Sequence, residues 1–330
     1  MKLFLIRLLF CFSLILFFAC ENSQPLESTA DSPKSTELQT LVKKGAPSSG
    51  GLEKAEPGLF IGEVNEKLAA ANANVRILYS EWITDLNSEK VGRTVYFKNV
   101  GNKKLTAHWV PGDPNRDGRT NITWLVDQVD GTPTGVTVED ANLAIDRAMT
   151  TWQNAATSSL PLEQIPDSGM DWGYVQNILE MGGIGGWLAD ITHAGWLPRA
   201  YFDAIAPPDG GDYILGVTHT LIWTENGIPT DMDNNGKMDV AFREIYYNNN
   251  FSWGIDSNYP DMDVESIVLH ETGHGLSQAH FGTLFRSGNG KLHFSPQSVM
   301  NAGFIGIPGQ ELTGTDLAGH SSIWASWPNR

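Results

Sequence analysis

Cysteine is almost absent from this 330-residue chain. Its two cysteines, Cys11 and Cys20, both lie within the first twenty residues. Residues 21–330 therefore hold neither a disulfide framework nor a zinc site built from thiolates. Any metal ion that this part of the chain binds must be held by nitrogen and oxygen ligands.

Basic residues are scarce as well, with 22 Lys and Arg against 38 Asp and Glu and a formal net charge of −16 at pH 7. An acidic surface repels phosphate backbones, so the composition predicts that nucleic acid is not a partner. The sequence shows no internal repeat. The excess of acidic over basic residues is typical of an exported domain, and some of the acidic side chains are candidates for calcium ligands.

The first twenty residues carry Lys2 and Arg7 ahead of an apolar run at 8–18. That run is too short to span a bilayer but is typical of a secretory signal. It ends in Ala19-Cys20, which resembles the cleavage box of bacterial lipoproteins. The resemblance implies an exported protein anchored in a membrane of the cell envelope or surface by a lipid on Cys20. Plain cleavage of a secreted protein and an uncut N-terminal anchor are the alternatives.

The stretch 268–280 reads Val-Leu-His-Glu-Thr-Gly-His-Gly-Leu-Ser-Gln-Ala-His. On a helix, His270 and His274 lie on one face about one turn apart, where two imidazoles can share a zinc ion. Glu271 is adjacent and can reach a metal-bound water without ligating the metal. His280 requires the helix to end and the chain to turn back. Three histidines leave the fourth zinc position open, which is typical of catalytic rather than structural sites.

This run resembles the metzincin metallopeptidase signature H-E-x-x-H-x-x-G-x-x-H, which is followed downstream by a Met-turn. Met300, in Ser298-Val299-Met300-Asn301, is the candidate for that methionine, an apolar floor beneath the zinc. The sequence departs from the signature at Ser277, where the family has glycine, and this puts the geometry of the loop in doubt. Because residues 21–330 lack cysteine, the cysteine-based latency of the related matrixins is not available to this chain.

The resemblance covers residues 113–330 and implies an α+β, metzincin-like catalytic domain. It predicts a mixed twisted sheet, two long helices in the N-terminal half and a loop-rich C-terminal half with one helix. Strands are expected at 122–126, 160–165 and 187–191, a helix at 138–153 and a closing helix at 315–327. The longest β-favoured run, 213–223, is either the edge strand that pairs with extended substrate or an interior strand.

Two segments precede this domain. Residues 21–58 are rich in Ser, Pro and Gly and predict a disordered linker. Residues 59–112 have small α/β character, with a helix at 62–73 and strands at 75–79, 94–97 and 105–110. They form either a pro-segment that packs over the active site and is later removed or a permanent N-terminal subdomain. We favour the pro-segment because the segment precedes the catalytic domain.

Residues 231–239 resemble the front of a calcium loop, with oxygen ligands at the first, third, fifth and ninth positions and Gly236 at the sixth. The candidate ligands are Asp231, Asp233, Asn235 and Asp239. The twelfth position is Phe242, so Glu244 is the candidate replacement for the usual glutamate. A bare polar hairpin is the alternative. Residues 113–121 also resemble the first half of a calcium loop, but they contain Arg116, and an ordinary turn is favoured there.

A second metal site could use Asp190, His193 and His219, although histidines beside strands more often serve packing or polar contacts. The sequence as a whole predicts a zinc-dependent endopeptidase with Glu271 as general base and a protein or peptide as substrate. The alternative is a calcium-organised surface binding module in which the zinc site is catalytically idle.

Overall fold

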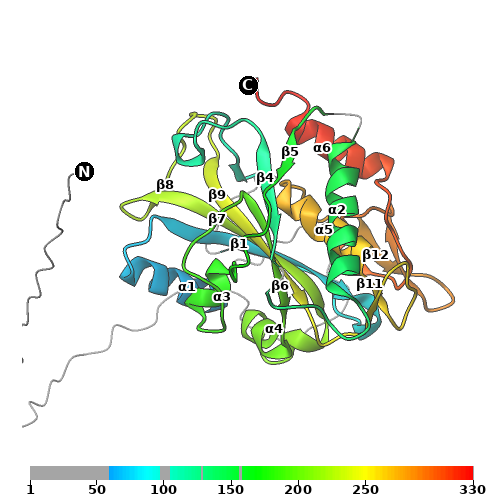
Figure 1. Ribbon diagram of the computed structural model, residues 1–330. Helices are drawn as coiled ribbons and strands as arrows, with labels where there is room; N and C mark the ends of the chain where they lie inside the picture. The colour runs from blue at the N-terminus through cyan, green and yellow to red at the C-terminus, as the bar shows by residue number, and fades with distance from the viewer. Residues whose placement is uncertain (1–58, 97–104, 128, 156–157, 330) are drawn as a thin grey trace, which may run out of the picture. The chain divides into compact units, whose positions relative to one another are not determined.

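The structure is a computed structural model that describes residues 59–96, 105–127, 129–155 and 158–329 (Figure 1). The predicted signal segment and linker, residues 1–58, lie outside the described residues. Within the described part, no helix is both long and apolar enough to cross a membrane.

A mixed sheet of ten strands organises the described part of the chain. Four strands run parallel, a fifth joins them antiparallel, and a sixth is antiparallel to the fifth. The main path is β14 (Gly303–Phe304), β1 (Val75–Asp85), β7 (Ile214–Glu225), β9 (Met238–Asn248), β6 (Ile191–Leu197), β4 (Ile122–Val126) and β5 (Leu162–Gln164). Three short strands pair beside it: β2 (Thr94–Tyr96), β3 (Ala107–His108) and β8 (Ile228–Pro229). The mixed sheet confirms the predicted α+β class.

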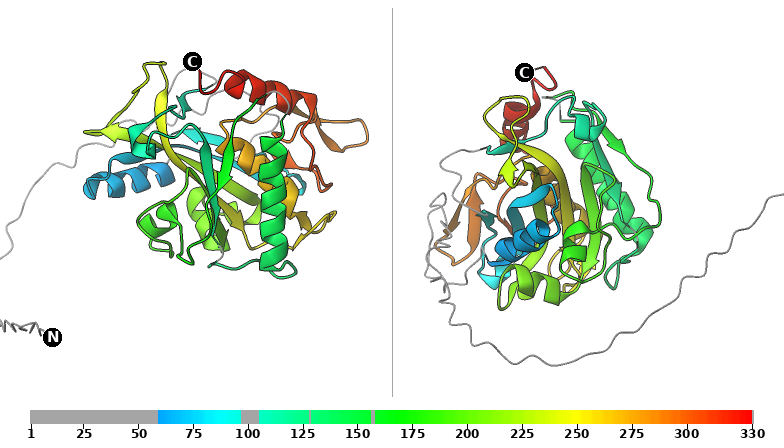
Figure 2. Two further views of the ribbon diagram at one scale, coloured as in Figure 1. Left: turned by 45° about the horizontal axis from the view of Figure 1, so that its top comes forward. Right: turned by 90° about the vertical axis from the view of Figure 1, so that its left-hand side faces the viewer.

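Helices cover both faces of the sheet, and each layer has its own apolar cluster (Figures 1 and 2). One cluster includes residues of α2 (Val138–Gln153), α5 (Val264–Gly275) and α6 (Gly314–Trp324). The other includes residues of α1 (Leu59–Ala70), α3 (Tyr174–Ile178) and α4 (Arg199–Ile205). Two small pairs complete the fold: β10 (Trp253–Gly254) with β11 (Met262–Asp263), and β12 (Thr283–Arg286) with β13 (Leu292–Ser295).

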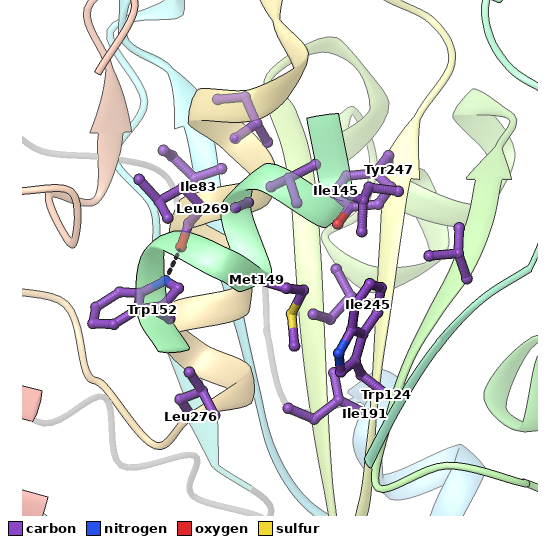
Figure 3. Packing of buried hydrophobic residues seen from close by; sticks show 14 of the residues in the cluster. Ile83, Trp124, Ile145, Met149, Trp152, Ile191, Ile245, Tyr247, Leu269 and Leu276 are labelled. Carbon is purple, nitrogen blue, oxygen red and sulfur yellow. Dashed lines mark hydrogen bonds between the residues drawn. The ribbon is translucent and has the colours of Figure 1, made fainter. Parts of the chain in front are cut away.

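Helix α2 forms where its sequence predicts it, with the same bounds. Thr137 caps its start by accepting a hydrogen bond from the Asp140 N–H, and Glu139 and Asp140 suit the positive end of the helix. Its apolar stripe is buried against α5. The indole N–H of Trp152 donates to the Leu269 carbonyl over 2.8 Å, which ties the two helices together (Figure 3).

Two strand assignments need correction. The strand expected at 187–191 instead begins at Ile191, because Trp187 packs its ring on Phe242 at a centroid distance of 4.2 Å in the other apolar layer. Strand β9 was not predicted, because Arg243 and Glu244 interrupt its apolar pattern. Both side chains are buried and paired: Arg243 donates to carbonyls at the end of α5, and Glu244 accepts N–H bonds from the start of α3.

The predicted boundary at residue 112 does not divide the sheet. Strand β1 lies inside the main sheet between β7 and β14, and β3 pairs with β9. Helix α1 packs on the same sheet, in the layer of α3 and α4. The described residues of 59–112 therefore share their core with residues 113–330, and the assignment of this segment as a pro-segment stays a prediction.

The contact between α2 and α5 can be tested by Trp152→Phe. The variant keeps a buried ring but leaves the Leu269 carbonyl without its partner, so we expect a loss of about 1–3 kcal/mol in the free energy of unfolding. Leu143→Ala, on the exposed face of the same helix, should change it by less than about 0.5 kcal/mol. Urea unfolding measures both, and equal effects would contradict the assigned contact.

Candidate metal centre

Helix α5 carries the first two histidines and is buried along its whole length. Asp263 caps it by accepting from the Ser266 N–H over 2.9 Å. Its apolar residues pack between the sheet and α2, so the rotation of the helix is fixed. That rotation places the rings of His270 and His274 side by side, with a centroid distance of 4.7 Å.

The helix ends at Gly275 in a hydrogen-bonding pattern that turns the chain back. The Gln278 N–H donates to the Gly273 carbonyl, and the Ser277 N–H donates to the His274 carbonyl. Ser277 adopts φ = +67°, the left-handed conformation that the family's glycine would adopt at no cost. The departure from the signature therefore leaves the turn in place, at a cost of about 1–2 kcal/mol.

The turn brings His280 to the other two histidines. Its ring centroid lies 4.6 Å from that of His274 and 5.3 Å from that of His270. The Nε2 atoms of His274 and His280 are 3.2 Å apart, and one ring nitrogen from each of the three lies within 4.8 Å of the others. The structure thus brings together all three predicted zinc ligands.

The backbone fixes the tautomers of two of these rings. Nδ1 of His270 donates to the Val299 carbonyl over 2.7 Å, and Nδ1 of His274 donates to the Gln278 carbonyl over 2.8 Å. Each ring therefore presents Nε2 as a lone pair, the arrangement that a metal ligand requires. Nε2 of His270 is buried and has no hydrogen-bond partner. A buried lone pair left unused is costly, so the three residues fit a cation of zinc's chemistry.

Glu271 points from α5 towards the sheet and is fully buried. Its carboxylate accepts from Thr218 Oγ1 over 2.6 Å and from the Ile83 N–H over 3.2 Å. Burial raises the pKa of Glu271 to about 7, although the neighbouring His274 and both hydrogen bonds oppose the shift. A carboxylate with a pKa near neutrality can both accept and return a proton, which suits a general base.

Met300 lies against α5, as predicted from the Met-turn. Its side chain packs on Gly273, where a Cβ atom would stand 2.3 Å from the sulfur. Gly273 is thus small because the methionine needs the space between the two helical histidines. The signature motif does not explain why position 273 is a glycine. The contact between Gly273 and Met300 could be found only in the structure.

Asp316, in the first turn of the last helix, holds the Met-turn in place. It accepts from the N–H of Val299 over 3.0 Å and from the hydroxyl of Ser298, and it forms a capping box with Thr313. Helix α6 therefore begins at Gly314 with Thr313 as its cap, one residue before the predicted start at 315. The Val299 carbonyl orients His270, so Asp316 supports the metal centre through the chain.

Glu81 of β1 is a second residue that sequence reasoning missed. It is 4% exposed, and its carboxylate lies 3.3 Å from Nδ1 of His274 and accepts from Thr94 Oγ1 over 2.8 Å. Burial raises the pKa of Glu81, but the nearby His274 and His280 and the hydrogen bonds from His274 and Thr94 together outweigh it, so the net direction is downward. Glu81 therefore stays ionised beside a predicted ligand, and no local motif marks it.

The predicted calcium ligands are brought together only in part. One carboxylate oxygen each from Asp231, Asp233 and Asp239 lies within 4.8 Å of the others. Asn235 turns its side-chain oxygen to the Lys237 N–H instead. Glu244 is not the missing twelfth ligand, because both of its oxygens cap α3.

The other metal candidates take part in separate polar contacts. Asp190 forms a buried ion pair with Arg116, 2.7 Å from Nε, which also explains the turn at 113–121. Nδ1 of His193 bonds the Tyr247 hydroxyl, and His219 bonds Ser80 and Tyr201 with its two nitrogens. These three residues form no common site in the part of the chain that the structure describes.

No known family model matches the chain, and no curated protein matches it. The resemblance to metzincins therefore rests on the residues of 268–280 and on Met300.

The fit of Met300 on the helix can be tested by Gly273→Ala. The added methyl group would stand 2.3 Å from the Met300 sulfur and 3.0 Å from a ring carbon of Trp152. Overpacking of about 1–3 kcal/mol should exceed the gain of up to about 1 kcal/mol in helix propensity. At Gly275 the nearest atom to an added methyl is 3.3 Å away, so Gly275→Ala should be roughly neutral. Urea unfolding compares the two, and a stabilised Gly273→Ala would contradict the packing.

Proposed function

We propose that this chain is a zinc-dependent peptidase of metzincin type. The observation that carries the proposal is the unpartnered, buried Nε2 of His270, which lies among the rings of His274 and His280. Beside them Glu271 is a buried carboxylate of raised pKa. Among the described residues, no other cluster of three side chains that could hold a metal ion includes a histidine.

Zinc held by His270, His274 and His280 would supply Lewis acidity towards the carbonyl of the peptide bond. Glu271 would accept the proton of the attacking water at its carboxylate and pass it to the leaving amine. Thr218 fixes one oxygen of that carboxylate, so the proton enters and leaves at a defined position. The carbonyls of Val299 and Gln278 keep two imidazoles in the ligand tautomer throughout.

A cavity of about 280 Å³ lies near this centre and suits part of a peptide substrate. Its lining includes Ile83, Val299, Phe304, Ile305 and Ile307, so the favoured side chain there is apolar. The second candidate is a calcium-organised surface binding module with an idle zinc site. The buried Glu271, whose ionised form is made costly by burial, favours the peptidase, because an idle zinc site has no need of a carboxylate there. Export and a lipid anchor on Cys20 stay predictions from the sequence.

The role of the base can be tested by Glu271→Gln. The amide has the same shape and can keep the bond to Thr218 but cannot accept the proton, so turnover of a mixed peptide library should fall by at least about 10²-fold. Zinc content, measured by elemental mass spectrometry, should stay at one ion per chain. His270→Ala serves as the control that loses the metal. Peptide cleavage that persists in Glu271→Gln would remove this residue from the mechanism.

Calcium binding can be tested separately by thermal unfolding. An ion bound to 231–239 at a hundred times its Kd should add about 2.7 kcal/mol of stability, which would raise Tm by several degrees. Calcium is titrated into the zinc-loaded protein, with Asp231→Asn/Asp233→Asn as the variant that should lose the effect. A Tm that does not move in wild type, or moves equally in both proteins, would favour the polar hairpin.

A further inference from the structure

Arg243 is a fully buried guanidinium that packs against the end of the helix that carries the first two ligands. It lies in the middle of β9, opposite Ile191 of β6 and Thr220 of β7. In the described part of the chain no carboxylate lies within 4.0 Å of its nitrogens, and its Nε has no hydrogen-bond partner. Because a buried charge without a counter-charge is costly, another interaction must stabilise Arg243 there.

Two carbonyls at the end of α5 supply that interaction. Nη1 of Arg243 donates to the His274 carbonyl over 2.7 Å and to the Gly275 carbonyl over 2.6 Å. Unpaired carbonyls and aligned peptide dipoles make this end of a helix negative, equivalent to about half a charge. A guanidinium stays protonated in a protein interior, so the attraction is permanent.

The same carbonyls belong to the turn that brings His280 to the metal centre. The His274 carbonyl also accepts from the Ser277 N–H over 2.9 Å, and Gly275 is the last residue of α5. Residues 276–280 then return, so that Nε2 of His280 stands 3.2 Å from Nε2 of His274. Arg243 therefore holds the point at which the returning segment begins.

A second arginine offers a matched comparison. Arg116 is also buried, and its guanidinium lies over the same indole ring as that of Arg243. The guanidinium carbons of Arg116 and Arg243 stand 5.1 Å and 5.5 Å from the centroid of the Trp109 ring. Arg116, however, pairs with Asp190, which lies outside the metal centre. The two arginines thus share their surroundings and differ in the segment that they hold.

We propose that Arg243 is a positioning residue for the metal centre, which fixes the end of α5 so that His280 completes the set of three ligands. The inference rests on the proposed zinc site and assigns the residue that sets its affinity from behind. Arg243 acts through the backbone of His274 and Gly275. Without its planar fork the Gly275 carbonyl loses a partner, and residues 276–280 are held less firmly. Residues that support metal ligands typically change metal affinity by about 10- to 100-fold.

The experiment compares Arg243→Lys with Arg116→Lys in the full chain. Each variant keeps the positive charge and loses the planar fork that lies over Trp109. Competition with a chromophoric chelator at neutral pH measures the Kd for zinc. Arg243→Lys should raise it about tenfold or more, and Arg116→Lys should change it by less than about twofold. Both variants should lower the urea midpoint, but a chain that stays more than about 99% folded binds with its intrinsic Kd, so lost stability alone does not change the value.

Cobalt(II) provides a spectroscopic reading of the ligand geometry. It takes the place of zinc in sites of this kind, and its visible absorption depends on the coordination geometry. We expect the bands of cobalt-loaded Arg243→Lys to shift and lose intensity, whereas those of Arg116→Lys should match the wild type. His270→Ala, which lacks one ligand, gives the reference for a broken site.

A second variant covers the case in which Arg243→Lys does not fold. Arg243→Gln places no charge in the interior, and its amide can still donate to one carbonyl. The same rise in the Kd for zinc is expected, again with Arg116→Lys as the control. If neither variant at 243 folds while Arg116→Lys does, Arg243 serves the fold as a whole and the assignment as a positioning residue is overturned.

The remaining outcomes separate this inference from the proposed function. An unchanged Kd and an unchanged cobalt spectrum in Arg243→Lys would overturn the positioning role, and so would an equal rise in Kd in both arginine variants. A wild-type chain that takes up no zinc would overturn the positioning role and the proposed function together. If the wild type binds zinc and Arg243→Lys binds it more weakly, but no peptide is cleaved, the positioning role stands and the peptidase proposal fails.

Discussion

The metal centre depends on backbone carbonyls that fix two imidazoles. Val299 and Gln278 take the Nδ1 protons of His270 and His274, which leaves Nε2 of each ring as a buried lone pair. Burial further lowers the pKa of His270 and His280, so these rings stay neutral. The buried Nε2 of His270 has no hydrogen-bond donor to pair with, and such a lone pair is stable only if something positive compensates it. Much of the surrounding structure positions these carbonyls.

Two turns supply those carbonyls, and each needs an exception to ordinary preferences. Ser277 adopts a left-handed conformation where α5 ends. Position 273 is a glycine, and the absence of a side chain there lets Met300 pack on the helix. Asp316 then fixes the segment before Met300 from the last helix. Local costs of this kind are common at functional sites, where the geometry of a ligand matters more than the stability of a single turn.

The N-terminal strand gives the chain its second unusual property. Because β1 lies between β7 and β14, residues that precede the metal-binding motif by almost two hundred positions contribute directly to the centre. Glu81 keeps a negative charge beside His274 in the interior, which is favourable only next to a positive or strongly polarised partner.

The sequence by itself determined the features that depend on neighbours along the chain. It identified the three histidines, Glu271, Met300 and the bounds of α2, because helical periodicity, capping and ligand spacing are local properties. It missed β9, because Arg243 and Glu244 are charged residues that a buried strand is not expected to contain. Their buried hydrogen-bond partners are known only from the structure. Only the tertiary structure decided that β1 joins the main sheet, that Glu81 reaches the centre and that Asp316 supports it through the Met-turn. Strand order and long-range hydrogen bonds arise from contacts between distant segments, and the residue pattern of one segment does not record its partner.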